Sequence, residues 1–232
     1  MAAANHTVKA FDEDLEELRA MVALLGGWGE AAVAAAVHAL RCPDDGAPAR
    51  AVDLAGHIDT LAQDVEQRAI CLIALRAPMA DDLRGIVAAL KIAQLIQRLG
   101  CLTLDMTLRL ELSAPPPVPD GVREAVAHLG EISTSSLRSS LDSFGAQDPA
   151  AAAAAAGAVD TAEALFRACY RMSLAGSGQG RPAVHLMLAA QSLTLAAALS
   201  SDVARVVHFA ATGDRLPRAS LRPVTEKAVA HG

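Results

Sequence analysis

The sequence predicts an all-α protein, and two features of its composition carry that prediction. Of the 232 residues, 53% are hydrophobic but only 3% are aromatic. Alanine and leucine supply most of the apolar residues, and both are strong helix formers, whereas the β-branched and aromatic residues that favour strands are sparse. A chain this apolar is not intrinsically disordered, and its length is sufficient for a sizeable core.

The first helix is expected over residues 7–25, where apolar side chains recur at three- and four-residue spacing opposite acidic ones. Gly26 and Gly27 come next and are expected to break or bend the helix. A helical stretch then resumes and ends near Cys42, because a Pro-Asp-Asp-Gly-Ala-Pro turn follows that residue.

Two further helices complete the first half of the chain. One covers residues 50–75 and stops before Pro78, and the other begins near Asp81 and extends to about residue 112. A Ser-Ala-Pro-Pro-Pro-Val-Pro segment follows, and three consecutive prolines favour extended geometry over helix. This segment is therefore a linker that divides the chain almost in half.

The second half repeats the pattern of the first. A helix is expected over residues 120–144, and Pro149 then stands at the first position of another helix, which runs to about residue 173. A glycine-rich turn leads into a last helix over residues 182–211, which Gly213 ends.

One part of the last helix is long and apolar enough to raise the question of a membrane span. Residues 182–201 contain no Asp, Glu, Lys or Arg. A stretch of that length could cross a bilayer. Histidine, glutamine, serine and threonine side chains interrupt it, however, and we therefore interpret it as a helix buried on most sides.

These elements predict two three-helix units, at residues 1–114 and 120–214, joined by a proline-rich linker at 115–119. An offset of 97 residues pairs five residues of the two third helices: Arg84 with Arg181, Val87 with Val184, Ala93 with Ala190, Gln94 with Gln191 and Asp105 with Asp202. We interpret this correspondence as internal duplication. Residues 215–232 form a basic tail that is expected to be flexible, although its charge would also suit an acidic partner or an anionic membrane surface.

Charge and cysteine content narrow the class of partner. The formal net charge is −6, and the body of the chain has no basic run of the kind that neutralises nucleic-acid phosphates. The four cysteines are widely spaced, which excludes a zinc finger or a thioredoxin-like motif. The opening residues lack the basic and apolar regions of a secretory signal. We therefore expect a cytoplasmic protein with reduced thiols and no nucleic-acid partner.

A series of short motifs along the chain shares its order with one known family. The motifs are Phe-Asp-Glu-Asp-Leu-Glu-Glu-Leu at 11–18, Ala-Pro-Met-Ala at 77–80, Asp-Leu-Arg at 82–84, Lys-Ile at 91–92, Gln-Arg-Leu-Gly-Cys at 97–101 and Thr-Gly-Asp at 212–214. Over nearly the whole chain, this order resembles the PhoU family of phosphate-uptake regulators.

The resemblance implies a fold and a function. The fold would be two tandem antiparallel three-helix-bundle repeats related by a pseudo-twofold axis, with the two third helices near the centre. The function would be that of a non-enzymatic cytoplasmic adaptor between the ATPase subunit of the phosphate ABC importer and a sensor histidine kinase. Such an adaptor is a negative regulator of the phosphate-starvation response, is commonly a homodimer, and meets the membrane only through its partners.

The resemblance also implies a metal site that this sequence has lost. In the family, a Glu and an Asp four residues apart, with an Asn four further on, place three ligands on one face of each third helix. The corresponding positions here are Gln97, Cys101 and Asp105 in the first repeat, and Thr194, Ala198 and Asp202 in the second. One carboxylate per helix is a poor site for iron or zinc, and we predict no tight cluster of either metal. Cys101 is expected to be a small buried hydrophobe.

Six residues are candidates for a partner-binding or regulatory surface: Asp81, Asp82, Arg84, Arg98, Asp105 and Asp202. A simpler role is open for each of them. The first two aspartates stand where they could cap a helix, and Arg84 could pair with a carboxylate on a neighbouring helix. Local pairs are also expected, of Asp105 with Arg98 or Arg109 and of Asp202 with Arg205.

The sequence contains no recognisable catalytic grouping. The seven histidines are scattered, and the chain has no phosphate-binding glycine loop, metalloprotease motif or nucleophile elbow. We therefore expect no enzyme activity and no cofactor. Two alternatives stay open: a diverged helical regulator that serves a different transporter or kinase, and a metal-binding helical bundle.

Overall fold

The computed structural model describes residues 2–42, 46–111, 120–175 and 181–217, and within these ranges all regular structure is helical. The helices are α1 (Ala2–Arg41), α2 (Ala47–Arg76), α3 (Ala80–Glu111), α4 (Asp120–Ala146), α5 (Pro149–Ala155), α6 (Ala158–Ala175) and α7 (Arg181–Thr212). The predicted all-α class is confirmed. The proposed linker at 115–119 lies outside the described residues.

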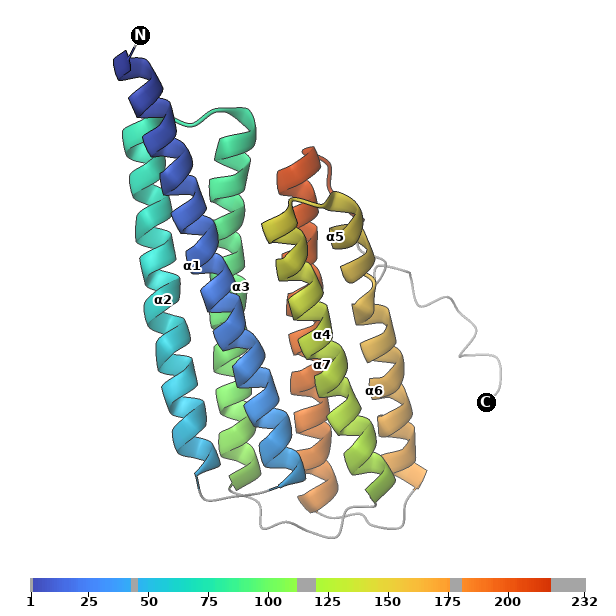
Figure 1. Cartoon of the computed structure of the whole chain (residues 1–232). Coiled ribbons are helices and arrows are strands. Elements are labelled where there is room, and N and C mark those ends of the chain that lie inside the picture. The colour runs from blue at the N-terminus through green and yellow to red at the C-terminus, as the bar shows by residue number, and fades with distance from the viewer. Residues whose placement is uncertain (1, 43–45, 112–119, 176–180, 218–232) are drawn as a thin grey trace.

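The helices run roughly parallel and antiparallel to one another in one elongated bundle (Figure 1). Helices α1, α2 and α3 pack together, as do α4, α6 and α7, with α5 against α4 and α7. The two groups meet along α3 and α7 and along α1 and α4. The two third helices of the sequence, α3 and α7, therefore lie side by side at the centre, as the family resemblance implies.

Helix α1 is continuous through Gly26 and Gly27, so the predicted break is wrong. The reason is the close approach of α1 to its neighbours. A Cβ atom at Gly26 would lie 2.3 Å from Cδ1 of Leu141, and one at Gly29 would lie 3.0 Å from Cγ2 of Ile96. Glycine here makes room for another helix, and packing outweighs the low helix propensity of glycine.

The predicted helix after Pro149 is also interrupted, because α5 ends at Ala155 and α6 begins at Ala158. The start is as expected: the Asp148 carboxylate accepts hydrogen bonds from the amides of Ala150 and Ala151. At the interruption, the hydroxyl of Ser201 on α7 donates a hydrogen bond of 2.6 Å to the carbonyl of Ala156. That bond satisfies a carbonyl at the end of α5 and stabilises the turn.

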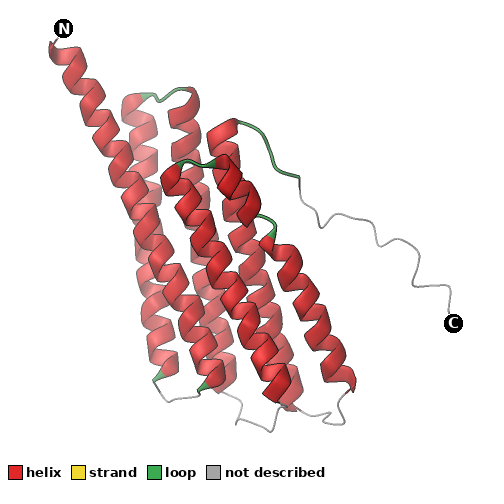
Figure 2. Ribbon diagram, turned by 45° about the vertical axis from the view of Figure 1, so that its right-hand side comes forward, coloured by secondary structure: helices red, strands yellow, loops and turns green. Residues whose placement is uncertain are grey.

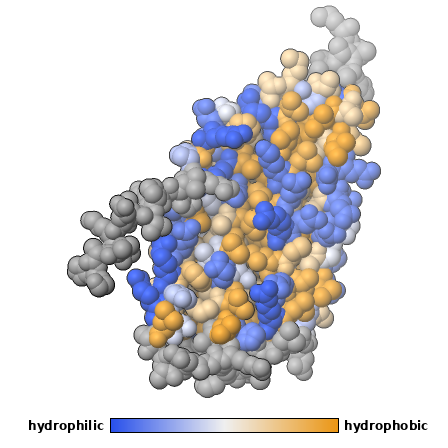
Figure 3. All heavy atoms as spheres, turned by 180° about the vertical axis from the view of Figure 1, so that it is seen from behind, coloured by the Kyte–Doolittle hydropathy of each residue, from blue (hydrophilic) through white to orange (hydrophobic). Residues whose placement is uncertain are grey.

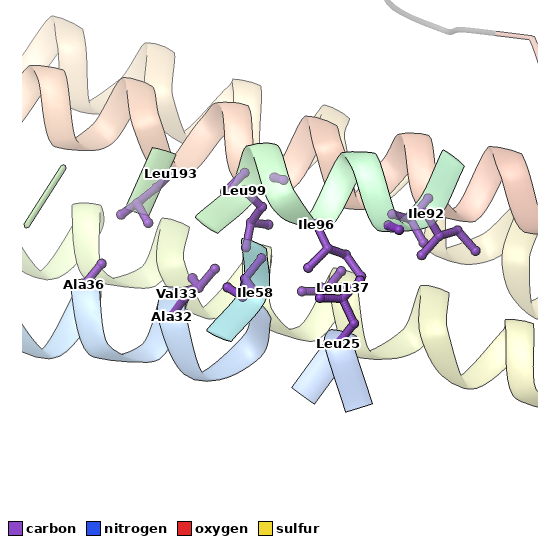
Figure 4. Close-up of a cluster of buried hydrophobic side chains, with 14 of the residues drawn as sticks. Leu25, Ala32, Val33, Ala36, Ile58, Ile92, Ile96, Leu99, Leu137 and Leu193 are labelled. Atoms are coloured by element: carbon purple, nitrogen blue, oxygen red, sulfur yellow. The ribbon is translucent and has the colours of Figure 1, made fainter. Parts of the chain in front are cut away.

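Most of the core is one continuous cluster of buried side chains that draws on both groups of helices. Leu25 and Val33 of α1, Ile58 of α2, Ile96 of α3 and Leu137 of α4 are all almost fully buried in it. Figure 4 shows several of these side chains converging between the helices. The two halves therefore share a core.

Serine side chains form a buried polar seam between α4 and α7. The Ser133 hydroxyl donates to the carbonyl of Leu193 at 2.7 Å, and the Ser140 hydroxyl donates to the carbonyl of Ser200 at 3.0 Å. The Ser133 and Ser140 hydroxyls also donate to carbonyls one turn back in α4. Small side chains with satisfied hydroxyls allow these two helices to approach closely.

Three helices are long and apolar enough to cross a membrane by length and composition: Ala10–Arg41, Ala80–Leu110 and Val184–Thr212. In the bundle, 44%, 44% and 56% of their most apolar windows are buried. For α7 this agrees with the interpretation of residues 182–201 as a helix packed against its neighbours.

The end of α7 follows the prediction. Gly213 has a left-handed φ of 81°, and its amide donates to the carbonyl of Phe209 at 2.8 Å. Residues 215–217, expected to begin a flexible tail, instead turn back along α7, where Arg205 donates to the carbonyls of Leu216 and Pro217. Residues 218–232 lie outside the described ranges.

Candidate functional site

The turn that connects α2 to α3 has an unusual backbone. Ala77 has a φ of 46° and Ala80 a φ of 47°, on either side of Pro78 and Met79. Left-handed conformations are uncommon for residues with a Cβ atom, so surrounding contacts must hold this turn in place. One such contact is the Asp82 amide, which donates to the carbonyl of Met79 at 3.2 Å. The turn sets the position at which α3 begins.

Arg84 joins the start of α3 to the end of α7. Its Nε donates to the carbonyl of Ala210 at 3.2 Å, and its Nη2 bonds the carboxylate of Asp81 at 2.5 Å. The two helix ends lie at the same, upper end of the bundle in Figure 2. The expected partner on a neighbouring helix was a carboxylate, and that expectation is wrong. The last carbonyls of a helix carry partial negative charge and lack helical partners, which makes them suitable acceptors for an arginine.

Asp81 and Asp82 also line a hollow of about 300 Å³ near the same end of the bundle. Arg19 of α1 contributes a positive charge, Phe144 lies in the last turn of α4, and Gln147 directly follows that helix. The hollow therefore combines two carboxylates, one guanidinium and apolar walls, and it is formed by both halves of the chain. No pattern in the sequence indicates that Arg19 belongs with the two aspartates.

The first set of former ligand positions lies along α3. Gln97 Nε2 bonds the carboxylate of Asp59 on α2, and Asp105 forms an ion pair of 2.8 Å with Arg109, one of its two expected partners. Cys101 is exposed, so its prediction as a buried hydrophobe is wrong. The reason is its place between Gln97 and Asp105 on the outward face of the helix.

The second set lies along α7 and is more enclosed. Thr194 is buried and its hydroxyl donates to the carbonyl of Ala190 at 2.8 Å, while Ala198 offers no ligand atom. Asp202 lies 3.8 Å from Nε of Arg205, the pairing that was expected. Among the described residues, no group of three or more His, Cys, Asp and Glu side chains could hold a metal ion. The prediction that the protein binds no tight iron or zinc cluster stays a prediction.

A second and larger hollow, of about 520 Å³, lies between α3 and α7. Arg98 and Asp202 line it, together with Lys91, Arg205 and Arg215. The six candidate residues thus do not form one constellation. Two of them line the first hollow and two the second, Arg84 joins α3 to α7, and Asp105 is in a local ion pair.

Charged pairs connect α1 to α4, which lie in front of α3 and α7 in Figure 1. Arg138 bonds Glu30 at 2.6 Å, and Arg41 bonds Glu131 at 2.9 Å. Hydrogen bonds from His128 and Arg41 hold the pKa of the Glu131 carboxyl below its usual range. These pairs are solvent-exposed and contribute to the alignment of the helices more than to chemistry.

Known proteins with similar sequences cover the length of this chain. A phosphate-specific transport system accessory protein PhoU homolog from Zymomonas mobilis is 33% identical over 220 residues, which is 91% of either chain. The homolog from Caulobacter vibrioides is 32% identical over 218 residues, 91% of this chain and 94% of its own. The chain belongs to the PhoU family. No family model matches it.

Solved PhoU structures share the fold. PhoU from Pseudomonas aeruginosa superposes with a TM-score of 0.81 at 21% identity, over 88% of this chain and all of that one. The phosphate transport system regulatory protein PhoU from Streptococcus pneumoniae gives a TM-score of 0.78 at 18% identity, over 90% of this chain and all of that one. The resemblance inferred from the motifs is confirmed, and with it the PhoU-like helical bundle.

Proposed function

We propose that this protein is a cytoplasmic accessory regulator of phosphate uptake that links the ATPase subunit of the phosphate importer to a sensor histidine kinase. The observation that carries the proposal is membership of the PhoU family over 91% of the chain, with relatives named as accessory proteins of the phosphate-specific transport system. The proposed role is that of a non-enzymatic negative regulator, which represses the starvation response when phosphate is plentiful, and which acts as a homodimer.

The surface proposed for the partners is the face formed by α3 and α7, with the adjoining turn between α2 and α3. Two features support this choice. The Asp-Leu-Arg motif is retained there, with Arg84 bonded to the end of α7. The outward residues of the same helices include Asp105 and Asp202, at the positions where the family keeps its polar motif. In this protein charge and packing would replace the metal in partner recognition.

Loss of the gene tests the regulatory role. In the source organism, deletion should raise expression from a phosphate-starvation promoter during growth in high phosphate, and expression of the intact chain should restore repression. Unchanged promoter activity in the deletion strain would contradict negative regulation. Purified ATPase subunit and the cytoplasmic part of the kinase, each tested for retention on the immobilised protein, identify the direct partners.

A double substitution tests the proposed surface. Asp105→Ala with Asp202→Ala should weaken retention of at least one partner, because both carboxylates belong to the α3–α7 face. Asp64→Ala with Asp142→Ala is the matched control, since it removes two exposed carboxylates from α2 and α4. Equal retention by the two double variants would restrict Asp105 and Asp202 to their local ion pairs.

A further inference from the structure

The groove between α3 and α7 gathers positive charge in a chain whose formal net charge is −6. Lys91 and Arg98 of α3 form one side, and Arg205 and Arg215 form the other. Asp202 is the single acidic side chain among the residues that line it. Four cationic side chains against one carboxylate give the groove a formal local excess of positive charge. We propose that it binds the oligophosphate chain of a soluble small molecule.

One cation of the groove already has partners, and the other three do not pair with acids. Arg205 is only 15% exposed; it bonds the carbonyl of Pro217 at 2.6 Å and lies 3.8 Å from Asp202. It thereby holds residues 215–217 in place as a wall of the groove. In the described ranges, Lys91, Arg98 and Arg215 form no ion pair with a carboxylate. These three are available to an external anion.

An aromatic ring positions two of the available cations. The Lys91 ammonium nitrogen lies 5.8 Å from the centre of the Phe209 ring, and Cζ of Arg215 lies 5.9 Å from it. Both distances are within the range of a cation–π interaction, which favours the presence of positive charge beside the ring. Like charges drawn to one ring repel each other, and a bound anion between them would relieve that repulsion.

The spacing of the cations favours a chain of phosphates over a single one. Lys91 and Arg98 are seven residues apart on one face of α3, which separates them by about 10.5 Å along the helix axis. An orthophosphate would contact both only if the two long side chains bent toward each other, whereas two or three linked phosphoryl groups span more of this distance. Arginine fits phosphate oxygens with paired hydrogen bonds, and three of the four cations are arginines.

The volume and walls of the groove suit a small molecule. Its 520 Å³ lies within the ordinary range for small-molecule sites, and Leu95, Val206 and Leu216 provide apolar walls. The opposite part of the α3–α7 face differs. The residues 97 positions after Lys91 and Arg98 are Leu188 and Leu195, which are 39% and 46% exposed. Figure 3 shows hydrophilic patches alternating with hydrophobic side chains on the side of the molecule hidden in Figure 1. The concentration of cations belongs to one part of this face.

Calorimetric titration of the full chain, in low salt with EDTA to exclude metal ions, tests the proposal. ATP and pyrophosphate are expected to bind saturably with one site per chain, and orthophosphate and adenosine to bind at least about tenfold more weakly, since each lacks most of the charge-assisted contacts. Equal affinity for ATP and pyrophosphate would assign the site to inorganic oligophosphates, and tighter binding of ATP to nucleotides.

Substitutions connect the binding to the groove. Lys91→Gln with Arg98→Gln should weaken the binding of ATP and of pyrophosphate at least about tenfold. Arg215→Gln by itself should also weaken the binding of both ligands. Arg167→Gln is the control, because Arg167 is an exposed arginine of α6 outside the groove. All substituted side chains are exposed. Helical circular dichroism of each variant checks that it is folded.

Four outcomes would overturn the proposal. They are the absence of saturable binding of both oligophosphates, equal binding of orthophosphate or adenosine, equal or tighter binding of a hexaglutamate peptide, and wild-type affinity in the Lys91→Gln/Arg98→Gln variant. The titration uses no protein partner, so either result leaves the proposed regulatory function to its own test.

Discussion

At the scale of single residues, glycines decide how closely the two halves of the bundle approach. Gly130 of α4 faces Val37 of α1 so closely that a Cβ atom would lie 2.0 Å from Cγ2 of the valine. Gly26 in α1 faces Leu141 in the same way, but the atom it meets is the end of a flexible side chain. Valine has a stiff χ1 angle, so it cannot move aside as a leucine can.

Gly130→Ala should therefore destabilise the protein by about 1–3 kcal/mol, the range for an overpacked core, despite the better helix propensity of alanine. Urea unfolding measures the free energy. Gly56→Ala is the matched control, because nothing lies within 4 Å of the added methyl group in α2, and it should stabilise by up to about 1 kcal/mol.

A second substitution identifies the cause of that loss. Val37→Ala removes the atoms that clash, so its combination with Gly130→Ala should cost less than the two single changes added together. Strictly additive losses would contradict the contact between positions 37 and 130 as the source of the strain.

At the scale of helices, the contact of α4 with α7 depends on small hydroxyl side chains. Ser140 is fully buried, and its hydroxyl donates to the carbonyl of Ser200 on α7 at 3.0 Å. A carbonyl inside a helix keeps its own amide partner, so loss of the hydroxyl removes a bond without leaving an unsatisfied acceptor. Added volume at the same position has nowhere to go.

Ser140→Ala should destabilise by about 1 kcal/mol, the net value of one hydrogen bond, and Ser140→Leu by about 2 kcal/mol or more, through overpacking. The neighbouring Ser139 is exposed, and Ser139→Leu should change stability by less than about 0.5 kcal/mol. Thermal unfolding of the three variants compares them. A smaller loss of stability for Ser140→Leu than for Ser140→Ala would show that α4 and α7 separate easily at this seam.

The outward face of α3 permits a test of the lost metal site. The family pattern is restored by Gln97→Glu with Cys101→Asp and Asp105→Asn, which sets three oxygen ligands on the outward face of α3. A carboxylate at position 97 would also face Asp59, the present partner of Gln97. The triple variant should retain more iron or zinc per chain after loading and desalting than the wild-type protein.

Elemental analysis by mass spectrometry measures the metal in both proteins. Gln67→Glu changes the net charge by the same amount on the exposed surface of α2, and it should leave the metal content at the wild-type level. Stoichiometric iron or zinc in the wild-type protein would contradict the prediction made from its lost carboxylates.

The sequence predicted helices well and their contacts poorly, for a physical reason. Apolar spacing records which face of a helix is buried, and this was sufficient to place α2, α3, α4 and α7 within a few residues. It does not record which helix covers that face, so it predicts a break at Gly26 and a buried Cys101, and both predictions are wrong. The basic groove combines residues more than 100 positions apart, such as Lys91 and Arg205, and only the packing of α3 on α7 brings them together.

At the scale of the whole molecule, the two three-helix groups share one core. The buried cluster contains residues of α1, α2, α3, α4 and α7, and α3 packs against α7 along the centre. The sequence suggested two units with a linker between them. Because the two units bury apolar side chains against each other, the unfolding of either one removes stabilisation from the other.

We therefore expect a single cooperative unfolding transition, although the chain is longer than most two-state domains. Trp28, the one tryptophan, is in α1 and stacks on His57 of α2 with ring centres 4.8 Å apart, so its fluorescence reports on the first half. Trp28→Phe with Phe166→Trp moves that probe to α6 in the second half. Urea transitions followed by both probes and by far-ultraviolet circular dichroism should coincide. A transition at lower urea for the α6 probe alone would contradict the shared core, because it would show that α1–α3 remain folded without α4–α7.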